Sequence, residues 1–211
     1  MIFTYGTTEI EYLKSKDQRL KQVIEQIGWI EREVDDDLFS AIIHQIIGQQ
    51  ISMKAQATIW KRLQDQCQII DPKTICACQK EDLRALGISP RKAEYILDFA
   101  HKVDQNKFDL QALWEMEDEQ VIEQLTSLKG IGVWTAEMIL LFSMQRKNVL
   151  SFQDYGIQKG LRMLHHHRQI DRKLFEKYKR CYSPYCSIAS FYLWAIANGQ
   201  IPEMQDPAAK K

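Results

Sequence analysis

Helical periodicity runs through almost all of this 211-residue chain and limits its fold more than any other feature. Apolar residues recur at intervals of three and four, and no segment alternates apolar and polar residues as a half-exposed strand does. The sequence therefore predicts an all-α fold. Helices are expected over residues 38–48, after the N-cap Ser52, after the turn at 87–90, around 121–125 and 134–141, beyond Asp154, around 174–178 and over 187–197.

The composition excludes several classes of protein. With 45% hydrophobic and 27% charged residues, the chain resembles an ordinary globular protein. No apolar run approaches the roughly 20 residues of a membrane-spanning helix, and the first residues lack the pattern of a secretory signal. We therefore expect a cytoplasmic protein without a membrane partner, nucleoid-associated in a bacterium or nuclear in a eukaryote. The odd number of five cysteines predicts reduced thiols, and their spacing fits neither a zinc site nor an iron-sulfur cluster.

The segment from Leu125 to Leu140 predicts two helices joined by a tight turn, Leu128-Lys-Gly-Ile-Gly132. Gly130 can take the left-handed backbone conformation that a reversal needs, and Gly132 lets another backbone approach the second helix. The start of that helix presents N–H groups at the positive end of its dipole, so it can bind phosphate without a formal charge. A plain corner between two helices would also explain these glycines.

The hairpin is one of several motifs that occur together. Leu-x-Gly-Ile-Gly followed by Trp134-Thr-Ala, with Asp154 twenty residues after Trp134, resembles the helix-hairpin-helix DNA glycosylases, most of all the DNA-3-methyladenine glycosylase II group. Blocks at 46–52, 86–93 and 184–194 follow in that group's order. The resemblance implies a two-lobed all-helical bundle with an active-site cleft between the lobes. Residues 38–150 would form the central lobe, and residues 1–37 with 151–211 the second.

The resemblance places the catalytic carboxylate on Asp154. It implies a monofunctional enzyme of base excision repair that releases alkylated, cationic purines such as 3-methyladenine and 7-methylguanine and leaves an abasic site. Such a base departs as a neutral molecule, so one carboxylate that stabilises the oxocarbenium-like sugar and admits water can suffice. Trp134 stands where bifunctional relatives carry a lysine nucleophile, so no lyase activity is expected. Without the family, Asp154 is as readily a helix N-cap.

The resemblance also implies which residues hold damaged double-stranded DNA. We expect the protein to be a monomer. Ile51 and Gln50 would form a wedge that fills the gap left by the flipped nucleotide. The base pocket would comprise Trp134, Tyr185, Met138 and Phe39, and the phosphate-binding hairpin Lys129, Gly130, Gly132, Val133 and Thr135. No cofactor is required, but Na⁺ or K⁺ could bind the backbone carbonyls of Thr126, Leu128 and Ile131. Without the resemblance, periodicity would make Trp134 a core residue, and Ile51, just before the N-cap Ser52, would be the apolar residue of a hydrophobic staple.

Two other functions remain open. One is a superfamily glycosylase for uncharged damaged or mismatched bases, and the other is a catalytically silent protein that binds DNA structures. Cys186 replaces an arginine that is common in the family, and Met138 replaces an aromatic residue of some members, so the substrate range is in question. Three successive histidines, His165 to His167, cannot converge on one metal ion from a helix, and we expect a solvated or phosphate-facing stretch there.

The charge distribution is uneven although the net charge is zero. Lys plus Arg number 28 and Asp plus Glu number 28, which excludes a basic protein that coats a polyanion. Residues 125–181, however, hold eleven bases against four acids, and residues 39–64 hold three bases and no acid. We interpret Asp35 to Asp37 as the start of a helix, where acids suit the dipole. The predicted phosphate contacts are local and partly made by the backbone, with a modest salt dependence.

Overall fold

The computed structural model describes residues 1–208, where regular structure is helical apart from one isolated bridge between Ile2 and Glu33. The predicted all-α fold is confirmed. Within those residues, none of the helices is both long enough and apolar enough to cross a membrane. The chain divides into two compact units. The middle unit comprises residues 35–144, and the terminal unit combines residues 1–34 with the chain from residue 145 onward.

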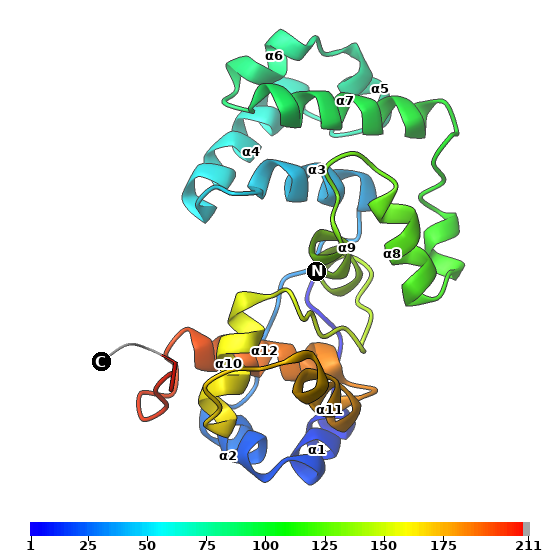
Figure 1. Ribbon diagram of the computed structural model, residues 1–211. Helices are drawn as coiled ribbons and strands as arrows, with labels where there is room; N and C mark the ends of the chain where they lie inside the picture. Colours follow the sequence, from blue (N-terminus) through cyan, green and yellow to red (C-terminus); the bar gives the residue numbers. More distant parts are fainter. Residues whose placement is uncertain (209–211) are drawn as a thin grey trace. The chain divides into compact units, whose positions relative to one another are not determined.

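The middle unit is built around α3, in which eight of eleven residues are buried. Helix α3 contacts α4, α7 and α9, and α7 in turn contacts α5 and α6 (Figure 1). The helices are, in chain order, α3 (Leu38–Gly48), α4 (Met53–Cys67), α5 (Pro72–Ala77), α6 (Lys80–Ala85), α7 (Pro90–Asp104), the 3-10 helix η1 (Ala112–Glu115), α8 (Asp118–Thr126) and α9 (Val133–Phe142).

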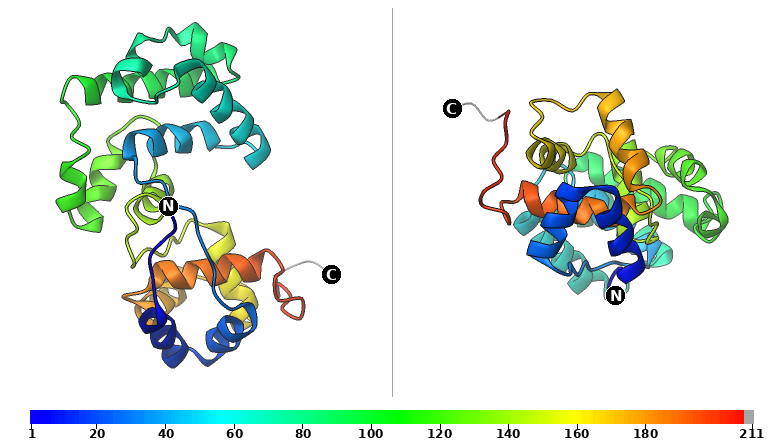
Figure 2. Two further views of the ribbon diagram at one scale, coloured as in Figure 1. Left: turned by 180° about the vertical axis from the view of Figure 1, so that it is seen from behind. Right: turned by 90° about the horizontal axis from the view of Figure 1, so that it is seen from below.

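The terminal unit packs helices from the first part of the chain against helices from its last part, drawn blue and yellow to red in Figure 2. Its central helix is α12, which is apolar on all sides, buries eleven of its twelve residues and contacts every other helix of the unit. A Cβ at Gly160 would collide with the backbone of Leu193, so this glycine allows α10 to pack closely on α12. The helices are α1 (Thr7–Lys16), α2 (Gln18–Ile27), α10 (Tyr155–His165), α11 (Arg172–Tyr182) and α12 (Cys186–Ala197).

Several helices begin at the caps that the sequence indicates. The Asp37 side chain accepts hydrogen bonds from the first turn of α3, which confirms the acidic run as a helix start. Ser52 caps α4 through the Ala55 amide, and Asp154 caps α10. Helix α11 also begins at an aspartate cap, Asp171, which the sequence analysis did not single out. These caps use local side chain to backbone bonds, so residue type and spacing are sufficient to predict them.

The unit boundaries lie three and six residues earlier than the predicted limits of 38 and 150. At the first boundary, the Asp35 amide donates to the Phe142 carbonyl at 2.9 Å, which keeps Asp35 with the middle unit. At the second, Gln145 Oε1 accepts a hydrogen bond from the Thr4 amide at 2.9 Å, so the chain after α9 joins the terminal unit at once. These hydrogen bonds join residues more than 100 positions apart and leave no local trace in the sequence.

Two of the three histidines, His165 and His167, are engaged in contacts inside the unit, whereas His166 is exposed as the sequence suggested. His165 Nε2 lies 3.2 Å from Asp17 Oδ2, the Tyr182 hydroxyl donates to the same oxygen at 2.8 Å, and His167 Nε2 lies 2.7 Å from the Tyr178 hydroxyl. Burial raises the pKa of Asp17, but the hydrogen bonds from His165 and Tyr182 outweigh it and lower the pKa to about 2. The histidines thus join α10 to the start of α2 and to α11. Within residues 1–208, no three metal-ligating side chains cluster around a possible ion.

Candidate functional site

Asp154 lies at the N-terminus of α10 in the terminal unit and is only 8% exposed. Its Oδ1 accepts a hydrogen bond from the Ile157 amide at 2.8 Å, as an N-cap does. The same oxygen accepts a second bond, also 2.8 Å, from the indole Nε1 of Trp194 on α12. Two N–H donors from different helices therefore fix the position of the carboxylate.

Trp194 contacts the candidate catalytic carboxylate, and sequence reasoning did not identify it. It closes the block at 184–194, but nothing in its spacing indicates a bond to an aspartate forty residues earlier. A Cβ at Gly156 would overlap the Trp194 ring and approach Asp154 Oδ1 to 3.2 Å, so the first turn of α10 needs a glycine there. The close packing of α10 on α12 and the indole bond thus depend on each other.

Tyr185 also belongs to the terminal unit and is half-buried at the start of α12. Its ring meets the ring of Tyr12 edge to face, with the centroids 5.1 Å apart. The Tyr12 hydroxyl donates to the Ser183 carbonyl just before this segment, so α1 supports it. Cys186 is buried and its thiol lies 3.3 Å from the Lys179 carbonyl. The Cys186 side chain therefore packs inside the unit. An arginine side chain at this position would have to take another direction.

The hairpin of the middle unit has the geometry that its glycines predict. Gly130 has a φ of +83°, and a Cβ there would overlap the ring of Tyr95 on α7. Gly132 is the N-cap of α9 in an extended conformation, and the space where its Cβ would lie is open. The first intrahelical bond of α9 runs from the Ala136 amide to the Gly132 carbonyl at 3.0 Å. The amides of the first turn thus precede the helical ladder, at the positive end of the dipole.

Lys129 on the hairpin is engaged in an ion pair, which the sequence did not predict. Its Nζ lies 3.0 Å from Asp98 Oδ1 on α7, and Lys102 Nζ lies 3.0 Å from the other oxygen of the same carboxylate. Burial would raise the pKa of Asp98, but the hydrogen bonds from Lys102 and Lys129 lower it. The ion pair with Asp98 raises the pKa of Lys129. A phosphate that binds Lys129 would therefore share the ammonium group with Asp98 or displace Asp98 from it.

The predicted wedge lies in the turn between α3 and α4. Ile51 is 37% exposed, and the exposed Gln50 has a φ of +55°, which a non-glycine residue rarely adopts. The neighbouring Gln49 donates from Nε2 to the Gly130 carbonyl at 2.8 Å. This bond ties the wedge turn directly to the hairpin, although the two segments are 81 residues apart.

Lys92 on α7 holds the same turn from another side. Its Nζ donates to the carbonyls of Ile47 and Gln49 at 2.8 and 2.6 Å, at the C-terminal end of α3 where carbonyls lack helical partners. Burial lowers the pKa of Lys92. The Arg-Lys-Ala sequence around Lys92 is part of a motif that resembles the family, but its spacing does not indicate that Lys92 binds the carbonyls at the end of α3. Lys92 and Gln49 together connect α3, α7 and the hairpin.

The remaining predicted residues of the middle unit differ in exposure. Trp134, in the first turn of α9, is 37% exposed, and Val133 beside it is exposed as well. Thr135 is buried, so it can offer the hairpin only its backbone amide. Met138 is only 3% exposed, and Phe39 is buried against the ring of Phe99 with a centroid distance of 5.1 Å. Met138 and Phe39 pack in the core of this unit, and their role in a base pocket stays a prediction.

Thr126 is the last residue of α8, and Leu128 and Ile131 lie in the turn that joins α8 and α9. The Leu128 carbonyl accepts a hydrogen bond from the Ile131 amide at 3.2 Å, which leaves its second lone pair for another partner. Carbonyl oxygens are ligands that hard cations accept. The chemistry of the turn fits a monovalent cation, which stays a prediction.

Comparisons with known proteins agree with these features. Residues 43–183 match the model of the HhH-GPD superfamily base excision DNA repair proteins. A putative DNA-3-methyladenine glycosylase of Bacillus subtilis is 35% identical over 127 residues, which cover 58% of this chain and 43% of that protein. The chain thus spans less than half the length of that relative.

Two solved structures cover nearly all of the chain. A crystal structure of a DNA-3-methyladenine glycosidase from Bacillus halodurans shares 33% identity over 97% of this chain and 95% of that one, with a TM-score of 0.85. A 3-methyladenine DNA glycosylase of Schizosaccharomyces pombe in complex with abasic DNA shares 28% identity over 90% and 97% of the two chains, with a TM-score of 0.79. Since the superfamily model matches well over half of its residues, the chain belongs to the HhH-GPD superfamily of base excision DNA repair proteins.

Proposed function

We propose that this protein is a monofunctional DNA glycosylase that hydrolyses the N-glycosidic bond of alkylated purines such as 3-methyladenine and 7-methylguanine in duplex DNA. The product is an abasic site. The observation that carries the proposal is the position of Asp154, a nearly buried carboxylate fixed by two N–H donors from α10 and α12. The names of relatives support it, because the two solved structures that match over most of both chains are named as a DNA-3-methyladenine glycosidase and a 3-methyladenine DNA glycosylase.

The chemistry of the substrate explains why one fixed carboxylate is enough. A purine methylated at N3 or N7 carries a positive charge and leaves as a neutral base, so the enzyme does not have to protonate it. As the bond breaks, positive charge develops on the sugar, and the Asp154 carboxylate stabilises it electrostatically. The same carboxylate orients the water that attacks the sugar. Because Oδ1 is held in advance, little reorganisation is needed when the charge appears.

DNA recognition in this proposal divides between backbone and side-chain contacts. The amides at the start of α9 bind a phosphate, and Ile51 with Gln50 fills the gap in the duplex. Trp134 and Tyr185 offer aromatic faces, which attract a cationic base with about 1 to 2 kcal/mol when water is excluded. A monovalent cation on the carbonyls of Thr126, Leu128 and Ile131 would add a positive charge beside the bound phosphate.

The decisive experiment compares two aspartate to asparagine substitutions in the terminal unit. Asp154→Asn should abolish the release of 3-methyladenine and 7-methylguanine from methylated duplex DNA while DNA binding persists. Asp171→Asn is the matched control, since Asp171 caps α11 through the Leu174 amide at 2.7 Å in the same way. Asparagine is as good a cap as aspartate, so both variants should fold. Release that continues undiminished in Asp154→Asn would refute the mechanism.

The same preparation separates the alternative functions. A panel of lesions that includes uncharged oxidised, deaminated and mismatched bases tests the first alternative, in which only uncharged bases are released. Binding to DNA without release from any substrate would support the catalytically silent protein. Borohydride added during turnover should trap no covalent adduct with DNA, because an indole occupies position 134 and cannot form a Schiff base.

A further inference from the structure

Helix α4 leaves most of its surface to solvent. All fifteen of its residues lie in the described part of the chain, and among them Leu63 alone is buried. The helix is attached to α3 along one edge, where Gln56 Nε2 donates to the His44 carbonyl at 2.9 Å and the rings of Trp60 and His44 lie 4.8 Å apart. An ordinary amphipathic helix buries a broader stripe of side chains. The outer face of α4 is therefore open to a partner.

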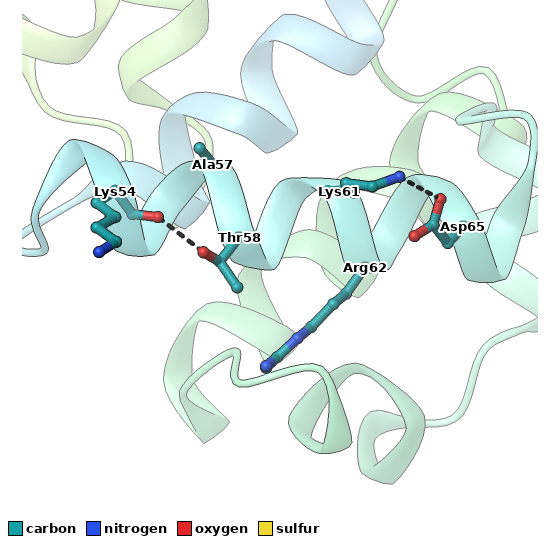
Figure 3. A pocket seen from close by; sticks show the side chains of 6 residues that line it. All are labelled: Lys54, Ala57, Thr58, Lys61, Arg62 and Asp65. Atoms are coloured by element: carbon teal, nitrogen blue, oxygen red, sulfur yellow. Dashed lines mark hydrogen bonds and ion pairs between the residues drawn. The ribbon is translucent and has the colours of Figure 1, made fainter.

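This face is lined by side chains that repeat with the helical period. An open hollow of about 510 Å³ runs along it (Figure 3). Small side chains lie at its middle, which lets a partner approach the helix closely, and cationic side chains lie on either side. The lining residues are Lys54, Ala57, Thr58, Lys61, Arg62 and Asp65, which we call the α4 face.

The charge of the α4 face is positive and available. Lys61 forms an exposed pair with Asp65 at 3.0 Å, in which the two side chains are 75% and 63% exposed, and such pairs hold their partners weakly. Arg62 donates to the Leu86 carbonyl at 3.1 Å, which orients it beside the hollow. From Lys54 to Lys61 the helix advances by about 10 Å. A stretch of duplex DNA of that length carries several phosphates.

The α4 face is continuous with the predicted wedge, because α4 begins two residues after Ile51. We infer that the α4 face binds the sugar-phosphate backbone of the duplex beyond the lesion, as a second phosphate-binding surface besides the hairpin. The proposal rests on the DNA binding of the proposed function, but not on its chemistry. Lys54 and Lys61 neutralise phosphates as the wedge enters the duplex, and the small side chains between them leave room for the backbone.

The test is the salt dependence of binding to a duplex that holds a stable abasic-site analogue. The slope of log K against log salt is negative, and removing one lysine that neutralises a phosphate reduces its magnitude by about 0.9. Lys54→Gln/Lys61→Gln should therefore reduce the magnitude of the slope by about 1.8. The control Lys73→Gln/Lys107→Gln removes the same charge from exposed sites of the same unit. The charge of Lys73 also acts on a nearby acid, since it helps to lower the pKa of Asp71. The control should keep the wild-type slope.

Each outcome has one meaning. A wild-type slope in Lys54→Gln/Lys61→Gln, or an equal reduction in the control, would overturn the proposal, since the face would then make no specific contact or act only through net charge. Base release by the wild-type protein is measured in parallel. If the slope of Lys54→Gln/Lys61→Gln differs from that of the control but no base is released, the proposed glycosylase activity is refuted and the proposal for the α4 face is supported. If bases are released but the two slopes agree, only the proposal for the α4 face is refuted.

Discussion

Lys92 should be a main determinant of the conformation of the wedge turn, and Lys92→Met tests this directly. The substitution removes the ammonium group but keeps an unbranched apolar side chain. Two carbonyls at the end of α3, those of Ile47 and Gln49, lose a donor at 2.8 and 2.6 Å. The interaction of the positive charge with the C-terminal end of the α3 dipole is removed as well.

The size of the effect follows from these contacts. A hydrogen bond to a charged group contributes about 1.5 to 3 kcal/mol. Burial lowers the pKa of Lys92, so removing the ammonium from water offsets part of that gain, and water can reach carbonyls near the surface in the variant. We therefore expect the free energy of unfolding to fall by about 1 to 2 kcal/mol. For a chain of this size, that corresponds to a Tm decrease of about 2 to 8 °C.

The assay combines urea unfolding with base release. Lys80→Met is the matched control, because Lys80 makes only an exposed ion pair with Glu94 at 3.6 Å, and its loss should change stability by less than about 0.5 kcal/mol. In Lys92→Met, release from duplex DNA should fall more than release from single-stranded DNA, which does not need a wedge. Equal stability of the two variants, together with an unchanged ratio of duplex to single-strand release, would refute the role assigned to Lys92.

Two further predictions concern Gly130 of the hairpin and the half-buried Asp17 of the terminal unit. Gly130→Ala should lower the free energy of unfolding by about 2 to 4 kcal/mol in urea unfolding, because φ is +83° and the new methyl group meets Tyr95, whereas Gly132→Ala should change it little. The pKa of Asp17 is lowered to about 2 from 3.8 in the fold, so its contribution is present above pH 4 and is lost as the pH falls toward 2. This loss amounts to about 2 kcal/mol in acid unfolding and should be absent in Asp17→Asn. An equal acid response in the two proteins would contradict it.

Features that depend on neighbouring residues could be predicted from the sequence. The caps Asp37 and Ser52 act within three residues, and the helices that follow them carry a clear apolar period. The N-terminal helices were not singled out, and α1 shows why. It buries only Glu9 and Leu13, so its sequence has little apolar periodicity, and the helix is held in place by tertiary contacts.

Contacts between distant residues could not be predicted. The bond from Trp194 to Asp154 joins residues 40 positions apart, and the bond from Gln49 to Gly130 spans 81 positions. Each of these residues lies in a motif that is similar to a motif of the family. The resemblance assigns roles to the residues, but it does not show with which other residues they form hydrogen bonds. The charge count near the hairpin likewise missed the pairing of Lys129 with an aspartate of α7. Packing decides these partners, and packing is not visible in a linear pattern.

The two interpretations of Asp154, as a helix cap and as the catalytic carboxylate, are compatible in this geometry. Catalysis by charge requires a carboxylate whose position does not depend on the substrate. The cap bond to the Ile157 amide meets that requirement, and the Trp194 indole adds a second direction of restraint. In the proposed mechanism, the residue that starts α10 is therefore also the carboxylate whose position α10 and α12 fix before the reaction. Because asparagine caps equally well, Asp154→Asn separates the two roles: it keeps the helix and removes the charge.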